Sequence, residues 1–188
     1  MRSNQITWII LNAVVVFIVI FAVAQYNRLI RLNIGVDEAY AQIEVQLKRR
    51  ADLIPNLVEA VKGYARHEQS TFDAVVTARA KATSASTVAD TAAADGMLTQ
   101  ALRGLLAVAE AYPDLKASAN FISLQEELAT TENKVAFSRQ FYNDNVRSLN
   151  TAVKTVPTNF FAGFAKVSER EFYEIDDPGD RKAPQVTF

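Results

Sequence analysis

The sequence has no cysteine and only one histidine, His67. The absence of cysteine excludes disulfide bonds, thiolate chemistry and the usual structural zinc ligands. One histidine is too few for a bundle di-iron site, which needs two Glu-x-x-His pairs, or for a zinc site built from several histidines. A Ser-His-Asp triad needs only one, but His67 lies in the polar stretch Ala65–Gln69, which predicts a solvated side chain. We therefore predict no metal site.

The sequence also has few glycines and almost no net charge. The six glycines form neither a phosphate-binding loop nor a dinucleotide-binding fingerprint, so no cofactor is predicted. Twenty Lys and Arg residues stand against 21 Asp and Glu residues, so no overall field attracts nucleic acid. Adjacent carboxylates occur at Asp37-Glu38, Glu126-Glu127 and Asp176-Asp177. Neighbours on a helix point to different faces, which favours solvated side chains over an acid–base pair, and no catalytic residue is predicted.

One long apolar run is present near the N-terminus. The residues from Ile6 to Ala24 carry no charge and include only two polar side chains, Thr7 and Asn12. As a helix this run spans roughly 28 Å, about the thickness of the hydrocarbon core of a bilayer. Trp8 and Tyr26 flank it where interfacial aromatic residues are expected. The sequence therefore predicts a membrane anchor within residues 1–25, in contact with the lipid bilayer from Ile6 to Ala24.

A cleavable secretory signal is the alternative. Arg2 supplies the positive start, and Ala22 and Ala24 resemble a small-residue cleavage site, so cutting the Ala24-Gln25 bond would release a soluble exported module. The apolar run exceeds the ~7 to 15 residues of a signal core, which favours the uncleaved span. Arg28 and Arg31 outnumber Arg2 across the span, which favours an inner-membrane protein with its large domain in the cytoplasm.

Beyond the span, apolar residues recur at steps of three and four along separate segments, the pattern of helices with one buried face. Strand patterning is absent. We predict an all-α fold, in which the N-terminal transmembrane helix is followed by an antiparallel up-and-down four-helix bundle over residues 26–175. The predicted helices are Tyr26–Arg49, which continues directly from the span, Leu53–Lys81, Met97–Ala111 and Ser118–Val156.

Two features set the predicted helix boundaries. Pro55 lacks a backbone N–H and is tolerated best in a first turn, so we predict a break and a chain reversal with Asp52 as the cap of a new helix. A kinked continuous helix is the alternative, because the apolar period continues through the proline. Thr83–Gly96 is rich in Ala, Ser, Thr and Asp, which predicts a mobile connection, although its alanines could extend a helix end.

Several long motifs occur in a fixed order after the span. They are Tyr26-Asn27, Val36–Ala39, Ala41–Ile43, Val45–Val58, Tyr112–Ala117, Leu124–Leu128, Thr131–Asn133, Arg139 and Tyr142-Asn143. Together they resemble the LemA family of bacterial membrane proteins. The resemblance implies a single N-terminal span, an antiparallel helical bundle and a place in the cell envelope. It implies little about activity, because the family has no established enzymatic reaction.

One charged residue interrupts the predicted apolar seam. Arg50 lies between Leu47 and Ile54, and because an unpaired buried charge is costly, a carboxylate from Asp52 or Glu132 is expected to reach it. This cluster is predicted to be a polar staple at the end of the bundle, with an anion- or partner-binding site as the alternative. Polar residues also interrupt the seam of the last helix, where they are expected to fix helix pairing: Thr131, Ser138 and Asn145.

The C-terminal part of the chain has two further features. Its aromatic residues are Phe160, Phe161, Phe164, Phe172 and Tyr173, and we expect them to fold back after Pro157 over an end of the bundle, with a membrane- or partner-facing patch as the alternative. Residues 176–188 are predicted to form an extended tail. Its last apolar residues, Val186 and Phe188, suit a PDZ-type groove, although packing on the bundle or disorder is the commoner fate.

These features favour a non-enzymatic, membrane-anchored helical module that binds other envelope proteins. The alternatives are the exported soluble form and an enzyme with an unrecognised site. A cluster of ionisable groups in a concave pocket would favour the enzyme.

Overall fold

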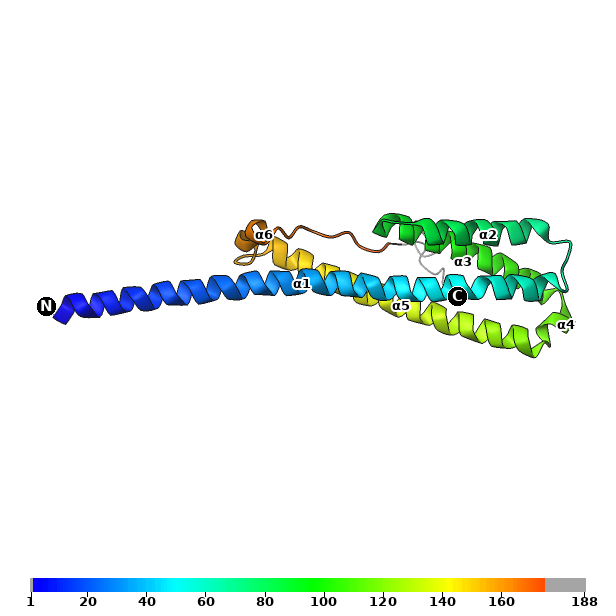
Figure 1. Ribbon diagram of the computed structural model, residues 1–188, viewed down its shortest axis with the longest axis horizontal. Coiled ribbons are helices and arrows are strands. Elements are labelled where there is room, and N and C mark those ends of the chain that lie inside the picture. The colour runs from blue at the N-terminus through cyan, green and yellow to red at the C-terminus, as the bar shows by residue number, and fades with distance from the viewer. Residues whose placement is uncertain (1, 175–188) are drawn as a thin grey trace, which may run out of the picture. The chain divides into compact units, whose positions relative to one another are not determined.

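The computed structural model describes residues 2–174 of the chain, with side chains from Gln5 onward. The helices of this part are α1 (Arg2–Lys62), α2 (Gln69–Ser84), α3 (Val88–Glu110), α4 (Pro113–Lys116), α5 (Ala119–Lys154) and α6 (Asn159–Ala165) (Figure 1). The described residues contain no strand, which confirms the predicted all-α class.

The described chain divides into two compact units. The anchor unit comprises residues 2–39 and 141–170, and the bundle unit comprises residues 40–140 and 171–174. The long helices α1 and α5 contribute residues to both units. Each unit is described by itself below.

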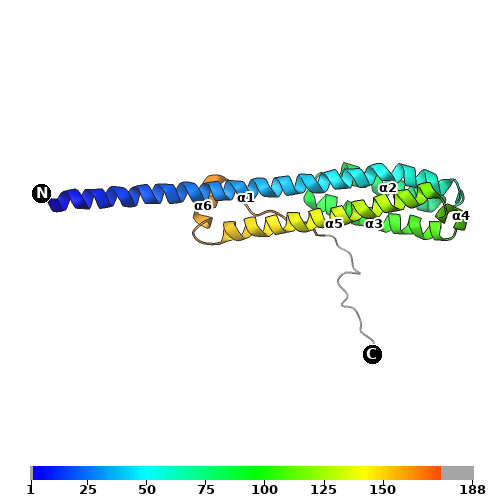
Figure 2. The same cartoon turned by 90° about the horizontal axis from the view of Figure 1, so that it is seen from below.

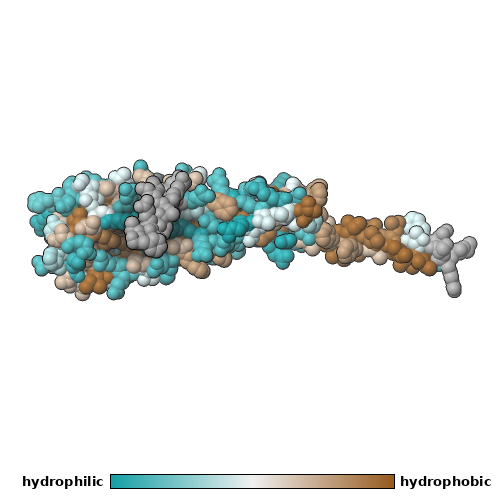
Figure 3. Space-filling view, turned by 180° about the vertical axis from the view of Figure 1, so that it is seen from behind, coloured by the Kyte–Doolittle hydropathy of each residue, from teal (hydrophilic) through white to brown (hydrophobic). Residues whose placement is uncertain are grey.

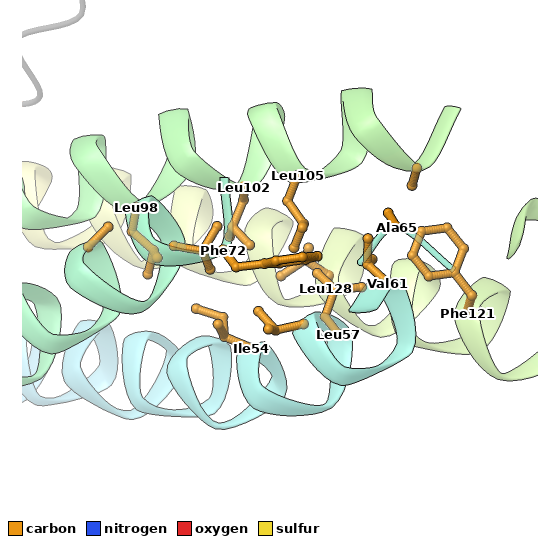
Figure 4. Close-up of a cluster of buried hydrophobic side chains, with 14 of the residues drawn as sticks. Ile54, Leu57, Val61, Ala65, Phe72, Leu98, Leu102, Leu105, Phe121 and Leu128 are labelled. Atoms are coloured by element: carbon orange, nitrogen blue, oxygen red, sulfur yellow. The ribbon is translucent and has the colours of Figure 1, made fainter. Parts of the chain in front are cut away.

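In the bundle unit, α2, α3 and the first part of α5 lie alongside the second half of α1, as Figures 1 and 2 both show. Short connections reverse the chain after each long helix, which gives the predicted antiparallel up-and-down order. The buried core residues are Ile54, Leu57, Val58, Val61, Ala65, Phe72, Val75, Ala78, Leu98, Leu102, Leu105, Ala109, Leu115, Phe121 and Leu128. In Figure 4 Phe72 lies between Leu102 of α3 and Leu57 of α1. Burial of each large apolar side chain stabilises the unit by about 1.5 to 3 kcal/mol.

The predicted break at Pro55 is wrong, because α1 runs through it to Lys62. The carbonyl of Ala51, four residues earlier, would normally accept the N–H that proline lacks. Arg79 of α2 donates its Nε–H to this oxygen instead, at 2.8 Å. Pro55 itself is exposed, so its ring displaces no core residue. The chain reverses after Lys62, in the turn that precedes Gln69.

The predicted mobile connection at Thr83–Gly96 is also wrong for most of its length. Only residues 85–87 lie outside the helices there, and α3 begins at Val88. The hydroxyl oxygen of Thr87 accepts the backbone N–H of Asp90 at 3.1 Å, which caps the helix. Small residues in the first turns allow this helix to pack closely, and Ala92, Ala94 and Asp95 are buried.

The anchor unit begins with a stretch of α1 whose side chains are exposed. Every described side chain from Gln5 to Phe21 is exposed, and the first buried residue of α1 is Leu29. Among the described residues, α1 is the one helix long and apolar enough to cross a membrane. Figure 3 shows that hydrophobic side chains form most of the surface of this part of the helix. The predicted continuity between the span and the first helix of the domain is therefore present.

The rest of the anchor unit packs against α1 beyond the apolar run. Leu29 meets Ala152 and Ala162 in a small core, against which further apolar residues pack: Leu32, Val153, Phe161 and Ala165. An added Cβ at Gly35 would lie 3.2 Å from the side-chain oxygen of Asn145, so glycine permits α5 to approach α1 closely there.

An extended segment follows α6, and Asn150 holds it. The side chain of Asn150 accepts the backbone N–H of Arg170 at 2.9 Å and donates to its carbonyl oxygen at 2.9 Å. This side chain therefore satisfies both backbone polar groups of one residue, as a neighbouring strand would. Arg170 also pairs with the carboxylate of Asp37.

Candidate functional site

The most conspicuous polar site lies inside the bundle unit and is centred on Arg50 of α1. This side chain is 2% exposed. Its Nη1 lies 2.6 Å from Oδ1 of Asp95 on α3, and its Nη2 lies 2.6 Å from Oε2 of Glu132 on α5. Nη2 also donates to the hydroxyl of Thr99 at 3.0 Å. One guanidinium group thus bridges three helices.

Asp95 is the hub of the site on the other side of this ion pair. Its carboxylate is 1% exposed, and Arg139 Nη1 lies 3.6 Å from its Oδ2. Two guanidinium groups therefore face two carboxylates, those of Asp95 and Glu132, and the formal charges balance. Removing an ion from water costs several kcal/mol, which mutual attraction and hydrogen bonds must offset.

Tyr173, on the extended segment after α6, completes the site. Its hydroxyl donates to Oδ2 of Asp95 at 3.3 Å and lies 3.4 Å from the carbonyl oxygen of Thr91. Burial raises the pKa of the Tyr173 hydroxyl well above its usual value, and the negative charge of Asp95 raises it further. The hydroxyl therefore stays protonated and remains a donor.

The contacts of this cluster limit its chemistry. The oxygens of Asp95 face Arg50, Arg139 and Tyr173, so a substrate would have to displace one of them to be deprotonated by this carboxylate. The arrangement links α1, α3, α5 and the C-terminal segment electrostatically. Among the residues with described positions, no group of three or more His, Asp or Glu is placed to hold a metal ion.

The structure brings only part of the predicted trio together. Glu132 contacts Arg50, but Asp52 does not: its exposed carboxylate accepts from Lys48 at 2.9 Å, one turn away on the same helix. Asp52 points away because Arg50 and Asp52 are only two residues apart on a continuous helix. Asp95 was not among the expected partners of Arg50, because it lies in the segment interpreted as mobile. The Thr-x-x-Asp pattern at Thr87–Asp90 is a helix-start signal, and it could have shown that Asp95 lies on a helix.

The polar residues of the α5 seam take different positions. Thr131 is buried and donates to the carbonyl oxygen of Glu127 at 2.8 Å, and Ser138 is also buried. Asn145 donates to the carbonyl oxygen of Phe141 and lies against Gly35. His67 is exposed, as expected, but it lies in the turn before α2 rather than in a helix.

The five aromatic residues near the C-terminus do not form one cluster. Phe161 packs in the anchor unit and Tyr173 is buried in the bundle unit. Phe160 and Phe164 are 68% and 81% exposed, so the expectation that they cover an end of the bundle is wrong. The candidate tail residues Val186 and Phe188 lie outside the described residues, as does Asp176-Asp177.

A groove on the bundle unit, of about 460 Å³, runs between α1 and α5. Its lining residues are Gln42, Gln46, Thr130, Asn133, Lys134, Phe137 and Ser138. Within the described part of the chain, Oε1 of Gln46 is buried without a hydrogen-bond partner. Phe137 is 70% exposed. Amides, hydroxyls, one cation and one aromatic ring suit a protein segment better than they suit a chemical reaction.

Comparison with known proteins agrees with the motifs. The LemA family model matches residues 39–188, which are most of the chain and include the whole bundle segment of α1, residues 40–62. The chain belongs to the LemA family. Membership in this family explains why the motifs occur in a fixed order along the chain.

The relatives of this chain are distant in sequence, but the similarity covers most of the chain. Magnetosome protein MamQ 2 of Paramagnetospirillum magneticum is 23% identical over 182 residues, which cover 83% of this chain and 67% of that protein. MamQ of Magnetospirillum gryphiswaldense is 22% identical over 190 residues, which cover 86% of this chain and 70% of that protein. Protein LemA of Metamycoplasma hominis is 26% identical over 141 residues, which cover 74% of this chain and 64% of that protein. None of these names denotes an enzyme, and the chain is a membrane-associated helical protein.

Proposed function

We propose that this protein is a non-enzymatic, membrane-anchored module that binds another protein of the bacterial cell envelope. The groove between α1 and α5 carries this proposal. Lys134 lines it with an ammonium group, and Phe137 lines it with an aromatic ring that is 70% exposed. A protein segment that offers a carboxylate and an apolar side chain would match both.

The buried site favours the same function over an enzyme. Arg50, Asp95, Glu132 and Arg139 face one another rather than an open pocket. We propose that this cluster is a polar staple, which fixes the register of α1, α3 and α5 and so keeps the binding face rigid. The relatives named as magnetosome proteins support membrane association of this module.

Site-specific photocrosslinking in cells tests the binding face. A photoreactive phenylalanine analogue replaces Phe137, and a control variant carries it at Val76 on α2, which is 55% exposed. We expect a discrete crosslinked protein from position 137 and none from position 76, and we expect Lys134→Glu to weaken the crosslink. Equal crosslinking at both positions, or none at position 137, would contradict the proposal.

We also propose that the protein resides in the inner membrane with its bundle in the cytoplasm, as the charges of Arg28 and Arg31 favour. Because the chain has no cysteine, Ser168→Cys creates a single thiol at an exposed position. A membrane-impermeant maleimide should label it only after cell lysis. Labelling in intact cells with a permeabilised outer membrane would place the domain on the opposite side.

A further inference from the structure

Helix α6 is fixed at the end of the apolar span. Thr158, which directly precedes α6, is 2% exposed, and its hydroxyl donates to the side-chain oxygen of Gln25 at 3.2 Å. Gln25 is the residue that follows the apolar run Ile6–Ala24. Figures 1 and 2 both show α6 beside α1 in this region of the anchor unit. If the run spans a bilayer, α6 lies where the bilayer ends.

The two faces of α6 have different environments. Phe161, Ala162 and Ala165 pack against α1 and α5 in the small core of the anchor unit. Phe160 and Phe164 lie one turn apart on another face, at 68% and 81% exposure. Val156, just before α6, is 71% exposed. Large apolar side chains at such exposure form an unpartnered patch on the part of the unit closest to the span.

We propose that the lipid bilayer itself covers this patch: α6 lies in the membrane–water interface with Phe160 and Phe164 inserted among the lipids. The patch lies near the end of the apolar run, because Thr158 contacts Gln25, and aromatic residues favour the interfacial zone of a membrane. Helices of this kind bury their apolar face by about 5 to 10 Å at the boundary between headgroups and acyl chains. Exposed basic side chains follow Gln25 within two turns, at Arg28 and Arg31, and Lys166 follows α6 directly; their charges suit anionic headgroups.

This second contact would change what the anchor does. A single transmembrane helix can tilt and rotate about its own axis. An interfacial helix held beside it through Thr158 and Gln25 restricts both motions, so the anchor unit would meet the membrane in one orientation. The inference rests on the proposed membrane anchorage, and its test separates the two.

Lipid-dependent quenching of tryptophan fluorescence in the full chain tests the inference. The protein is reconstituted in phosphatidylcholine–phosphatidylglycerol vesicles with lipids that carry a quencher near the headgroup. Trp8 is the only natural tryptophan, so Trp8→Phe provides a silent background. Phe164→Trp and, separately, Phe160→Trp introduce the probe on α6. Phe141→Trp is the matched control, because Phe141 is 42% exposed in the anchor unit but lies roughly 20 Å further along α5 from its end.

We expect blue-shifted emission and several-fold stronger quenching at positions 160 and 164 than at position 141. Equal quenching at the three positions would overturn the interfacial placement. A blue shift without lipid quenching would also overturn it, since it would show that protein covers the patch. The wild-type protein with Trp8 serves as the reference for the span: quenching of Trp8 without quenching at 160 and 164 refutes this inference alone, whereas no quenching of Trp8 refutes the anchorage.

Discussion

Arg79 donates to the carbonyl oxygen of Ala51, the group that Pro55 leaves without its helical partner. This contact between α2 and α1 compensates for the proline and joins the two helices at the same point. A residue that would normally end a helix is thereby accommodated in the middle of the bundle wall.

A double-mutant cycle tests this relationship. Arg79→Met keeps the apolar stem but removes the donor, and we expect it to lower the free energy of unfolding by about 1 to 2 kcal/mol. In a Pro55→Ala background the N–H of residue 55 can take the carbonyl, so the same change should cost less than about 0.5 kcal/mol. Urea unfolding of the full chain in mild detergent, followed by circular dichroism, measures both. Identical costs in the two backgrounds would show that Arg79 acts only through packing.

The buried ion pair gives a second prediction. Asp95→Asn leaves Arg50 without its fully buried counter-charge and should destabilise the protein by roughly 3 to 5 kcal/mol. Asp52→Asn removes an exposed pair with Lys48 and should cost less than about 1 kcal/mol. Thermal unfolding of the two variants measures both losses of stability. Similar small losses at both sites would mean that Arg50 is adequately paired by Glu132 alone.

Tyr173 gives a prediction for the pH dependence of stability. Its pKa is raised in the folded protein by burial and by Asp95, so the folded state keeps a proton that the unfolded state loses above about pH 10. The contribution of Tyr173 is therefore fully present below pH 10. Above pH 10 the free energy of unfolding should fall by up to about 1.4 kcal/mol per pH unit.

The control for this effect is another tyrosine-to-phenylalanine change. Tyr64 is 47% exposed, and Tyr64→Phe should leave the alkaline loss of stability unchanged. Tyr173→Phe should make the loss shallower, at the cost of lower stability at neutral pH. Parallel alkaline profiles for wild type and Tyr173→Phe would rule out this residue as the cause.

The core assignment predicts a contrast between leucine and histidine sites. Leu128→Ala and Leu57→Ala each remove a buried side chain and should destabilise by roughly 2 to 5 kcal/mol. Leu47 belongs to the same predicted seam but is only half-buried, so Leu47→Ala should cost less. His67→Ala, at an exposed turn, should change stability by less than about 0.5 kcal/mol. Equal shifts in melting temperature at Leu128 and His67 would show that the core is assigned wrongly.

Much of the fold follows from the sequence because apolar periodicity reports directly on buried helix faces. The two errors have physical causes that a local pattern does not contain. Helix α1 continues through Pro55 with a donor from Arg79 on the carbonyl oxygen of Ala51, and Arg79 lies 24 positions further along the chain than the proline. The Ala-rich start of α3 has little apolar surface, yet it is helical because Thr87 caps it and Asp95 meets Arg50.

Only part of the candidate site could be predicted from the sequence. A charge on an apolar seam requires a counter-charge, so the need for a carboxylate near Arg50 follows from the sequence, and Glu132 was one of two candidates. Asp95 comes from α3, Tyr173 from the segment after α6 and Arg139 from α5, two turns after Glu132, and only the packing of the bundle unit brings them together. Exposure is likewise a property of packing, which is why Phe160 and Phe161, adjacent in sequence, lie in different environments.

The central claim is that the apolar N-terminal segment stays attached as a membrane anchor, and one measurement tests it most directly. The protein is extracted from membranes that have been washed with alkaline carbonate, digested with trypsin and analysed by mass spectrometry. A peptide that begins at Ser3 and ends at Arg28 crosses the Ala24-Gln25 bond. The account predicts that this intact peptide is recovered from the membrane fraction. Recovery of a peptide that begins at Gln25, from protein in the soluble fraction, would contradict it.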